Sequence, residues 1–275
     1  MGKCAYCDED RKLTREHVWS DSILEIFQSV APKTFDFNRQ IVHEGDPMLK
    51  DTCGRCNSDL SDTDAFAMRL VGEFLRSGPP LGVKLPLSDD RLWRWVFKTT
   101  FNLHRFSGNP LAWALPLRSY LTGKTGRPAN LSLFFAAWDD LSPGGVALNF
   151  NIVHWLDVRQ PQFDMLDSVT DEEIRSQAAM ATVVKPGFGV FLPMVWKQLN
   201  APAYSVLRTE LMSHGWLDCV ADGTAQRIPF DMFSSGRFEI LVPSRKHVAF
   251  IDGRKAALAG EAGALEKDDE RQKTT

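Results

Sequence analysis

The sequence contains no long apolar run. Its longest uncharged segment extends from Leu141 to Leu156 and includes Pro143 and two glycines. A membrane-spanning helix needs about 20 mainly apolar residues, so the sequence predicts no such helix and no membrane partner. The first ten residues also lack the apolar stretch of a secretory signal. We therefore expect a cytoplasmic protein.

The sequence also lacks a surplus of positive charge. Its 275 residues include 32 Lys or Arg and 35 Asp or Glu, which gives a formal net charge of -3. This balance excludes a protein that is basic throughout and coats nucleic acid, but it leaves room for a local basic surface. With 44% hydrophobic residues the composition is globular, and the length indicates about two domains.

Cysteine is scarce and unevenly placed. Four of the five cysteines form two C-x-x-C pairs, Cys4 with Cys7 and Cys53 with Cys56, while Cys219 stands alone and receives no role. In a reducing compartment close pairs favour metal binding over disulfides, and two pairs supply the four thiolates of a tetrahedral zinc site. Such a site is structural, because it leaves no coordination position open. Two unrelated pairs, or a redox C-x-x-C, are the alternatives.

Helix and strand signals divide the chain into four parts. Residues 1–78 hold both cysteine pairs and end in a helix that begins near Ser61. Residues 79–109 are expected to form a connecting basic amphipathic helix, residues 110–252 an α+β domain, and residues 253–275 a flexible charged tail. The predicted fold class is therefore α+β, with a small zinc-braced unit followed by a larger domain of antiparallel sheet and helices.

Strand-forming segments in the larger domain flank turn residues in three places. The expected strand pairs are 131–138 with 146–156, 178–184 with 188–195, and 238–242 with 247–251. Two helices are expected among them, one after Thr170 and one over residues 204–214. This pattern indicates antiparallel hairpins rather than a parallel sheet.

A carboxylate directly followed by a histidine lies between the cysteine pairs, in Leu13-Thr14-Arg15-Glu16-His17-Val18. Neighbouring side chains on a strand point to opposite faces, so Glu16 can hold a divalent metal while His17 faces a water beside it. Asn57 follows the second cysteine pair and can supply another oxygen ligand. An ordinary surface pair on a strand is the alternative interpretation of Glu16 and His17.

The order C-x-x-C, Thr-Arg-Glu-His-Val, C-x-x-C-Asn and a helix with an early Asp resembles an HNH nuclease of the zinc-knuckle type. The resemblance covers roughly residues 4–76. It implies a β-hairpin and a helix around one catalytic metal ion, known as the ββα-metal motif. It also implies an enzyme that cuts phosphodiester bonds in DNA, and sometimes in RNA.

The resemblance also implies a role for individual residues. His17 corresponds to the general base that activates water, Glu16 to the acidic metal ligand, and Asn57 to a ligand or a brace of the loop. The four paired cysteines correspond to a structural Zn²⁺ site, and the catalytic ion would be Mg²⁺ or Mn²⁺. The family commonly places a further His or Asn on the helix, and His43 could enter from the intervening strand. The acids that this helix offers instead are Asp59, Asp62 and Asp64.

Charge along the chain predicts where nucleic acid binds. Residues 1–76 carry ten basic and fourteen acidic residues, whereas residues 84–127 carry eight basic and two acidic ones. Because phosphate neutralisation dominates affinity, the second segment is the expected binding surface. At 100° per residue, four of its basic residues share one stripe of the expected helix. The predicted contacts, with one added from the N-terminal part, are Arg15, Arg91, Arg94, Lys98 and Arg105. A solvated face that only keeps the helix soluble is the alternative.

The resulting hypothesis is a metal-dependent HNH-like endonuclease that hydrolyses DNA, by nicking or by double-strand cutting. Such two-part nucleases resemble effectors of bacterial antiviral defence or of mobile elements. One alternative is a noncatalytic zinc module that binds nucleic acid or protein, and another is an RNA-cleaving toxin that uses the same site. The C-terminal domain would then select substrate, form a homodimer or receive an activating partner.

Overall fold

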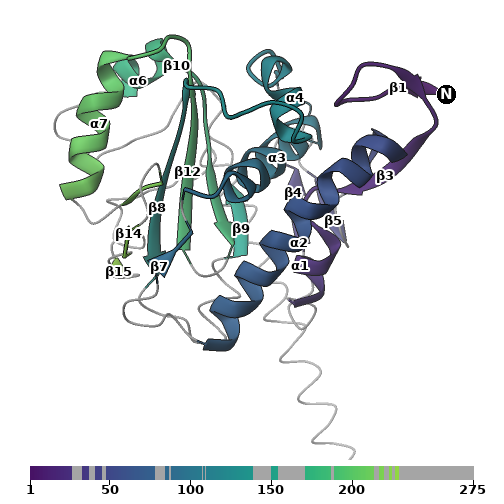
Figure 1. Cartoon of the computed structure of the whole chain (residues 1–275), viewed down its shortest axis with the longest axis horizontal. Coiled ribbons are helices and arrows are strands. Elements are labelled where there is room, and N and C mark those ends of the chain that lie inside the picture. Colours follow the sequence, from purple (N-terminus) through teal and green to yellow (C-terminus); the bar gives the residue numbers. More distant parts are fainter. Residues whose placement is uncertain are drawn as a thin grey trace, which may run out of the picture. The chain divides into compact units, whose positions relative to one another are not determined.

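Figure 1 shows a computed structural model of the whole chain. The structure describes residues 1–26, 33–36, 41–44, 48–77, 84–86, 88–106, 108, 110–138, 150–153, 171–186, 189–213, 217–219, 223–224 and 227–228. All of these belong to one compact unit, Met1–Glu239, and a second unit covers Ile240–Thr275. The predicted strands 238–242 and 247–251 and the predicted tail lie outside the described residues. The domain boundaries expected at residues 78, 109 and 252 stay predictions.

The N-terminal part is built from short strands and one long helix. Strand β1 (Gly2–Lys3) pairs with β2 (Asp10–Arg11), and β3 (Leu13–His17) pairs antiparallel with β6 (Met48–Cys53). Helix α2 (Gly54–Ser77) follows β6 without a linker. The helix that we expected to begin near residue 61 therefore begins earlier, inside the second cysteine pair. We call β3, β6 and α2 together the β3–β6–α2 unit.

A folded insertion separates the two strands of this unit. It contains helix α1 (Asp21–Ile26) and the antiparallel pair of β4 (Lys33–Asp36) and β5 (Ile41–Glu44). This insertion accounts for the long spacing between the two cysteine pairs, which lie far apart in sequence but meet in space.

Helix α3 (Asp90–Phe106) lies between α2 and the large sheet (Figure 1), and it contacts α2, β6 and strand β12 (Gly189–Trp196). Asp89 caps its first turn, because the Asp89 Oδ1 atom accepts the backbone N–H of Arg91 at 2.8 Å. Nearly every residue from Leu92 to His104 is buried. Packing on two sides explains why this helix is apolar around most of its circumference.

The rest of the unit is a seven-stranded sheet with the order β13-β8-β12-β11-β9, to which β10 is added at β12 and β15 at β8. The strand pairs are antiparallel except β15 with β8. The bounds not yet given are β8 Leu131–Trp138, β9 Phe150–Val153, β10 Ala178–Ala181, β11 Val183–Pro186, β13 Leu217–Asp218 and β15 Arg227–Ile228.

The sheet confirms one expected hairpin and corrects another. Strands β11 and β12 pair antiparallel, with Val184 opposite Phe191, as the turn at residues 186–187 predicted. The expected pairing of 131–138 with 146–156 is wrong, because β8 pairs with β12 and β13 whereas β9 pairs with β11. A turn-like sequence between two strand-forming segments does not specify which strands become neighbours.

The remaining short elements complete the unit. The two predicted helices are present as α6 (Asp171–Gln177) and α7 (Pro202–Ser213). The others are η1 Leu115–Leu117, α4 Arg118–Leu121, and the antiparallel pair of β7 Lys84–Leu85 with β14 Gly223–Thr224. The α+β class is confirmed. Among the described residues, no helix combines the length and the apolar character that crossing a membrane requires.

Candidate functional site

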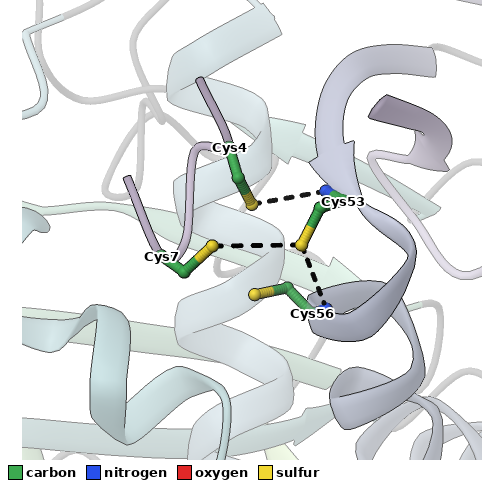
Figure 2. A group of neighbouring side chains, drawn as sticks. All are labelled: Cys4, Cys7, Cys53 and Cys56. Carbon is green, nitrogen blue, oxygen red and sulfur yellow. Dashed lines mark hydrogen bonds between the residues drawn. The ribbon is translucent and has the colours of Figure 1, made fainter. Parts of the chain in front are cut away.

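The four paired cysteines meet in one cluster. Their sulfur atoms all lie within 4.8 Å of one another, and the Sγ atoms of Cys7 and Cys53 are 3.9 Å apart. Figure 2 shows that Cys4 and Cys7 come from one loop, whereas Cys53 and Cys56 come from the end of β6 and the first turn of α2. Tetrahedral Zn–S bonds of about 2.3 Å place neighbouring sulfurs about 3.8 Å apart. The distance between Cys7 and Cys53 matches this spacing, and the four sulfurs lie close enough together to hold one metal ion.

Electrostatics within the cluster also call for a cation. Burial alone would raise the pKa of Cys4, but backbone N–H donors, among them that of Cys53, lower it to about 7. Burial and the neighbouring cysteines instead raise the pKa of Cys56. Four thiolates cannot share this buried space without compensating charge, and a divalent ion supplies that charge. We conclude that the cysteines could hold a metal ion such as zinc.

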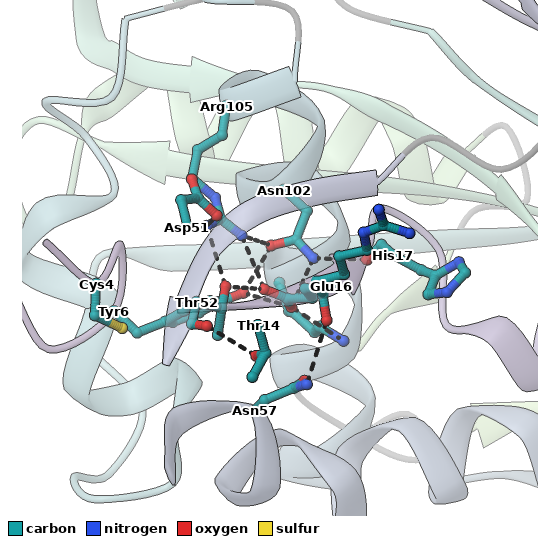
Figure 3. A network of polar contacts seen from close by, with 12 residues as sticks. Cys4, Tyr6, Thr14, Glu16, His17, Asp51, Thr52, Asn57, Asn102 and Arg105 are labelled. Atoms are coloured by element: carbon teal, nitrogen blue, oxygen red, sulfur yellow. Dashed lines mark hydrogen bonds and ion pairs between the residues drawn. The ribbon is translucent and has the colours of Figure 1, made fainter. Parts of the chain in front are cut away.

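The strand β3 places Glu16 inside the protein rather than at an open site. Only 3% of this residue is exposed, and Figure 3 shows its carboxylate at the centre of a polar network. Asn102 Nδ2 donates to Oε1 at 2.8 Å, and the Tyr6 hydroxyl lies 3.1 Å from the same oxygen. The Thr52 hydroxyl and Arg105 Nη2 donate to Oε2. Both oxygens of Glu16 are thus fully engaged with protein donors.

Two cations from α3 form ion pairs with three acids of this network. The Lys98 ammonium lies 2.8 and 2.7 Å from the two carboxylate oxygens of Asp64 and 3.5 Å from Glu16 Oε1. The Arg105 guanidinium lies 3.1 Å from Glu16 Oε2 and 2.6 Å from Asp51 Oδ1. We call these five residues the buried charge cluster. Charged groups removed from water need such partners, because unpaired buried charge is strongly destabilising.

The pKa shifts of Lys98 and Glu16 agree with this pairing, whereas at Asp64 burial outweighs the effect of Lys98 and raises the pKa. Burial would lower the pKa of Lys98, but the carboxylates of Asp64 and Glu16 together raise it above its ordinary value. Burial would likewise raise the pKa of Glu16, but Lys98 and Arg105 lower it. The cluster therefore contains an ionised carboxylate and an ionised ammonium side by side.

The predicted catalytic Mg²⁺ or Mn²⁺ does not fit these residues. Such an ion needs several oxygen ligands with free lone pairs and usually keeps bound water. Glu16 is buried with both oxygens occupied, and both oxygens of Asp64 bind Lys98. Among the described residues, the four cysteines form the one group of ligating side chains close enough to share a metal. In this arrangement the carboxylate of Glu16 serves donors of the protein itself, and its predicted role as a metal ligand stays a prediction.

His17 occupies a different environment from its neighbour. Figure 3 shows its ring directed away from the network around Glu16, as the alternation of a strand requires. The side chain is 25% exposed, and Nε2 lies 3.8 Å from Asp21 Oδ1. Arg15, two residues earlier on the same strand, is exposed. The outward face of β3 thus presents an imidazole and a guanidinium together.

Two asparagines hold the backbone on either side of Glu16. Asn57, in the first turns of α2, donates from Nδ2 to the Arg15 carbonyl at 3.5 Å. Asn102, on α3, donates from Nδ2 to the His17 carbonyl at 3.1 Å. This contact joins Asn57 to strand β3, and the two roles expected for Asn57, a metal ligand or a brace of the loop, stay predictions.

The other acids proposed as ligands are dispersed. Asp59 lies 3.4 Å from the ammonium of Lys124, and Asp62 is exposed. Neither joins Glu16 or His17 in a group of metal-ligating side chains within the described residues. The side chain of His43, on β5, lies outside the described residues.

The expected basic stripe on α3 is wrong for two of its four members. Lys98 is 2% exposed, and the side chain of Arg105 is 3% exposed. The prediction assumed that the side of α3 with the basic residues faces solvent. In the structure, other elements cover that side around Lys98 and Arg105. Arg91 is 38% exposed and pairs with Asp89, and Arg94 is half-buried. Of the predicted nucleic-acid contacts, Arg15, Arg91 and Arg94 therefore stay at the surface.

Sequence reasoning missed Asn102 and Tyr6. Tyr6 lies between the first two cysteines, and its hydroxyl is 2.7 Å from Asn102 Oδ1. One feature of the sequence could have indicated Asn102. It lies with Lys98 and Arg105 in a helix that is otherwise rich in Trp, Phe and Leu. Polar side chains at such positions mark internal networks as readily as exposed faces.

Comparisons with protein-family models, with curated proteins and with solved structures give no match to this chain. The likeness to HNH nucleases thus rests on the residues themselves. Of the features that carry it, the structure brings together the four cysteines that could bind a metal.

Proposed function

We propose that the chain is an HNH-like nuclease in which His17 is the general base for phosphodiester cleavage. The observation that carries the proposal is the β3–β6–α2 unit, a strand pair that leads directly into a helix and carries the four-cysteine cluster at the junction. This arrangement has the order of elements of the ββα-metal motif. His17, to which the resemblance assigns the role of general base, stands at the end of β3.

The chemistry of the outward face supports this proposal. Histidine is the side chain best suited to accept a proton near neutral pH, and general-base assistance contributes about 100-fold to 10,000-fold. In the proposed reaction His17 takes a proton from water while the new P–O bond forms, and the bond to the 3′ oxygen breaks. The 3′ oxygen takes a proton from solvent to become a hydroxyl, and the phosphate stays on the 5′ side. Arg15, exposed on the same strand, can contact the phosphate. Asn57 and Asn102 hold the backbone that carries both residues.

A second candidate function is a noncatalytic zinc module that binds nucleic acid or protein. The observation in its favour is the neutralisation of Glu16 by Lys98 and Arg105, which leaves the proposed enzyme without its usual acidic ligand. Under this alternative, Arg15 and His17 would be binding residues only.

Cleavage assays separate the two candidates. Zinc-loaded protein is incubated with supercoiled plasmid and, separately, with single-stranded RNA, each with and without added Mg²⁺ or Mn²⁺. The nuclease proposal predicts nicking by the wild type and a loss of at least about 100-fold in His17→Ala. Asp10→Asn, an exposed change in β2, is the matched control and should cut normally. If wild type and His17→Ala behave alike on both substrates, the nuclease proposal fails, and retained binding would favour the module.

A further inference from the structure

The position of Lys98 has a consequence for metal binding. Its ammonium bridges a carboxylate on β3 and a carboxylate on α2, at 3.5 Å from Glu16 Oε1 and 2.7 Å from Asp64 Oδ2. These are the two elements that would share a divalent ion in a ββα-metal site. The lysine comes from a third element, α3, and reaches the pair from inside the protein.

The surroundings fix the lysine in this place. Lys98 is 2% exposed, so its charge cannot move to water without leaving the core. Its two contacts with Asp64 are short, and they are charge-assisted. Withdrawal of the ammonium would leave two carboxylates facing each other with only Arg105 to compensate Glu16. Lys98 and Arg105 thus supply the positive charge for the Glu16–Asp64 pair, while Arg105 also pairs with Asp51.

We propose that the Lys98 ammonium is the resident cation of the Glu16–Asp64 pair and excludes a divalent ion from it. An ammonium has three donors and no lone pair, so it satisfies carboxylates but cannot itself ligate a metal. An entering ion would meet the positive charges of Lys98 and Arg105 at short range, where Coulomb repulsion is strong. The second metal implied by the likeness to HNH nucleases is thus replaced by a side chain.

The exclusion of a divalent ion by Lys98 depends only on charge around the Glu16–Asp64 pair. It is therefore expected whether or not the protein cuts nucleic acid. If the proposed nuclease activity is present, it follows that added Mg²⁺ or Mn²⁺ does not enter the Glu16–Asp64 position. A metal-binding measurement therefore tests the lysine separately from the test of His17.

The experiment is a titration of full-length, zinc-loaded protein with Mn²⁺, followed by the electron paramagnetic resonance signal of free Mn²⁺. Mn²⁺ prefers oxygen ligands and does not compete for four thiolates. Wild type and Lys98→Arg, which keeps the positive charge, should bind no Mn²⁺ at the pair. Lys98→Met, which keeps the length of the side chain and removes its charge, should gain one Mn²⁺ per chain. The gained ion should be lost again when Asp64→Asn is added.

Two results would overturn the inference. One is Mn²⁺ binding by the wild type that disappears in Asp64→Asn or Glu16→Gln. The other is a folded, zinc-containing Lys98→Met protein that binds no Mn²⁺, because the lysine would then not be what keeps the ion out.

For a Lys98→Met protein that does not fold without a metal ion, the test is thermal unfolding of the variant and of the wild type, each with and without Mn²⁺. Folding restored by Mn²⁺ supports the inference, since a ligand that binds the native state stabilises it. If the variant stays unfolded under all conditions, the effect of Mn²⁺ on the unfolding midpoint of the wild type is the deciding measurement. A midpoint that Mn²⁺ leaves unchanged supports the inference, and one that Mn²⁺ raises through Glu16 and Asp64 contradicts it.

Discussion

At the scale of single residues, neighbours in sequence have opposite roles. Glu16 faces inward and binds five donors, whereas His17 faces outward and is 25% exposed. The alternation of a strand makes this division unavoidable once β3 has one buried face. The resemblance assigned metal binding to the first residue and base catalysis to the second. The structure places the first side chain inside the protein and the second near its surface, and both roles stay predictions.

The buried His104 gives a prediction about pH. His104 is buried against Trp113, whose Nε1–H donates to His104 Nδ1 at 3.2 Å, and burial lowers the pKa of His104 to about 4. The unfolded chain binds this proton near pH 6.5, so the contribution of His104 to stability is complete above pH 6.5. It is lost progressively as the pH falls toward 4.

His104→Gln keeps an acceptor for Trp113 but does not titrate. Between pH 7 and pH 5, the free energy of unfolding of the wild type should therefore fall by about 2 kcal/mol more than that of the variant. Urea unfolding of both zinc-loaded proteins at the two pH values measures this difference. Equal losses would show that His104 is not kept neutral by burial.

At the scale of elements, α3 organises the candidate site. It contributes Lys98, Asn102 and Arg105, which contact residues of β3, β6 and α2. The Arg105 guanidinium also lies over the ring of Tyr6, 4.9 Å from its centroid, and so ties α3 to the first cysteine loop. Helix α3, which we expected to connect two domains, therefore packs against the β3–β6–α2 unit and binds its polar side chains.

Removal of one α3 contact should loosen β3. Asn102→Ala deletes donors to Glu16 Oε1 and to the His17 carbonyl, and leaves both buried acceptors short of a partner. We expect a loss of about 3 kcal/mol in the free energy of unfolding, measured by urea. The imidazole signals of His17 in NMR spectra should also shift.

Asn130→Ala is the matched control, because Asn130 makes one side-chain bond, to the Trp196 carbonyl in the sheet, away from β3. Its loss should be about 1 kcal/mol, with unchanged His17 signals. Equal destabilisation by the two variants, with His17 unaffected in both, would show that α3 does not position β3.

Local patterns predicted the elements better than their partners. The cysteine spacing predicted the cluster, Asp89 predicted the start of α3, and apolar runs predicted β8 and β12. The sequence could not show that Lys98 lies inside, because helical periodicity gives one angular position for a residue and does not say how many sides of the helix are covered. The pairing of β9 with β11 likewise depends on contacts across the sheet rather than on the turn beside it.

At the scale of the whole molecule, the cysteine cluster and the buried charge cluster differ in where their positive charge comes from. The thiolates of the cysteine cluster call for an external cation, whereas the buried charge cluster contains its own. The formal net charge of -3 conceals this division. The net charge also does not reveal that Lys98 and Arg105 are buried, so that neither adds positive charge to a surface for nucleic acid.

We propose that the chain binds one structural metal ion through four thiolates and that Lys98 takes the place of a second one at the Glu16–Asp64 pair. The most direct test is the count of tightly bound metal per chain in purified wild-type protein, combined with the absorption spectrum after Co²⁺ replacement. We predict one zinc per chain, a cobalt spectrum typical of four thiolate ligands, and loss of the ion in Cys53→Ser. Two tightly bound ions per chain, or full zinc retention by a folded Cys53→Ser protein, would contradict this proposal.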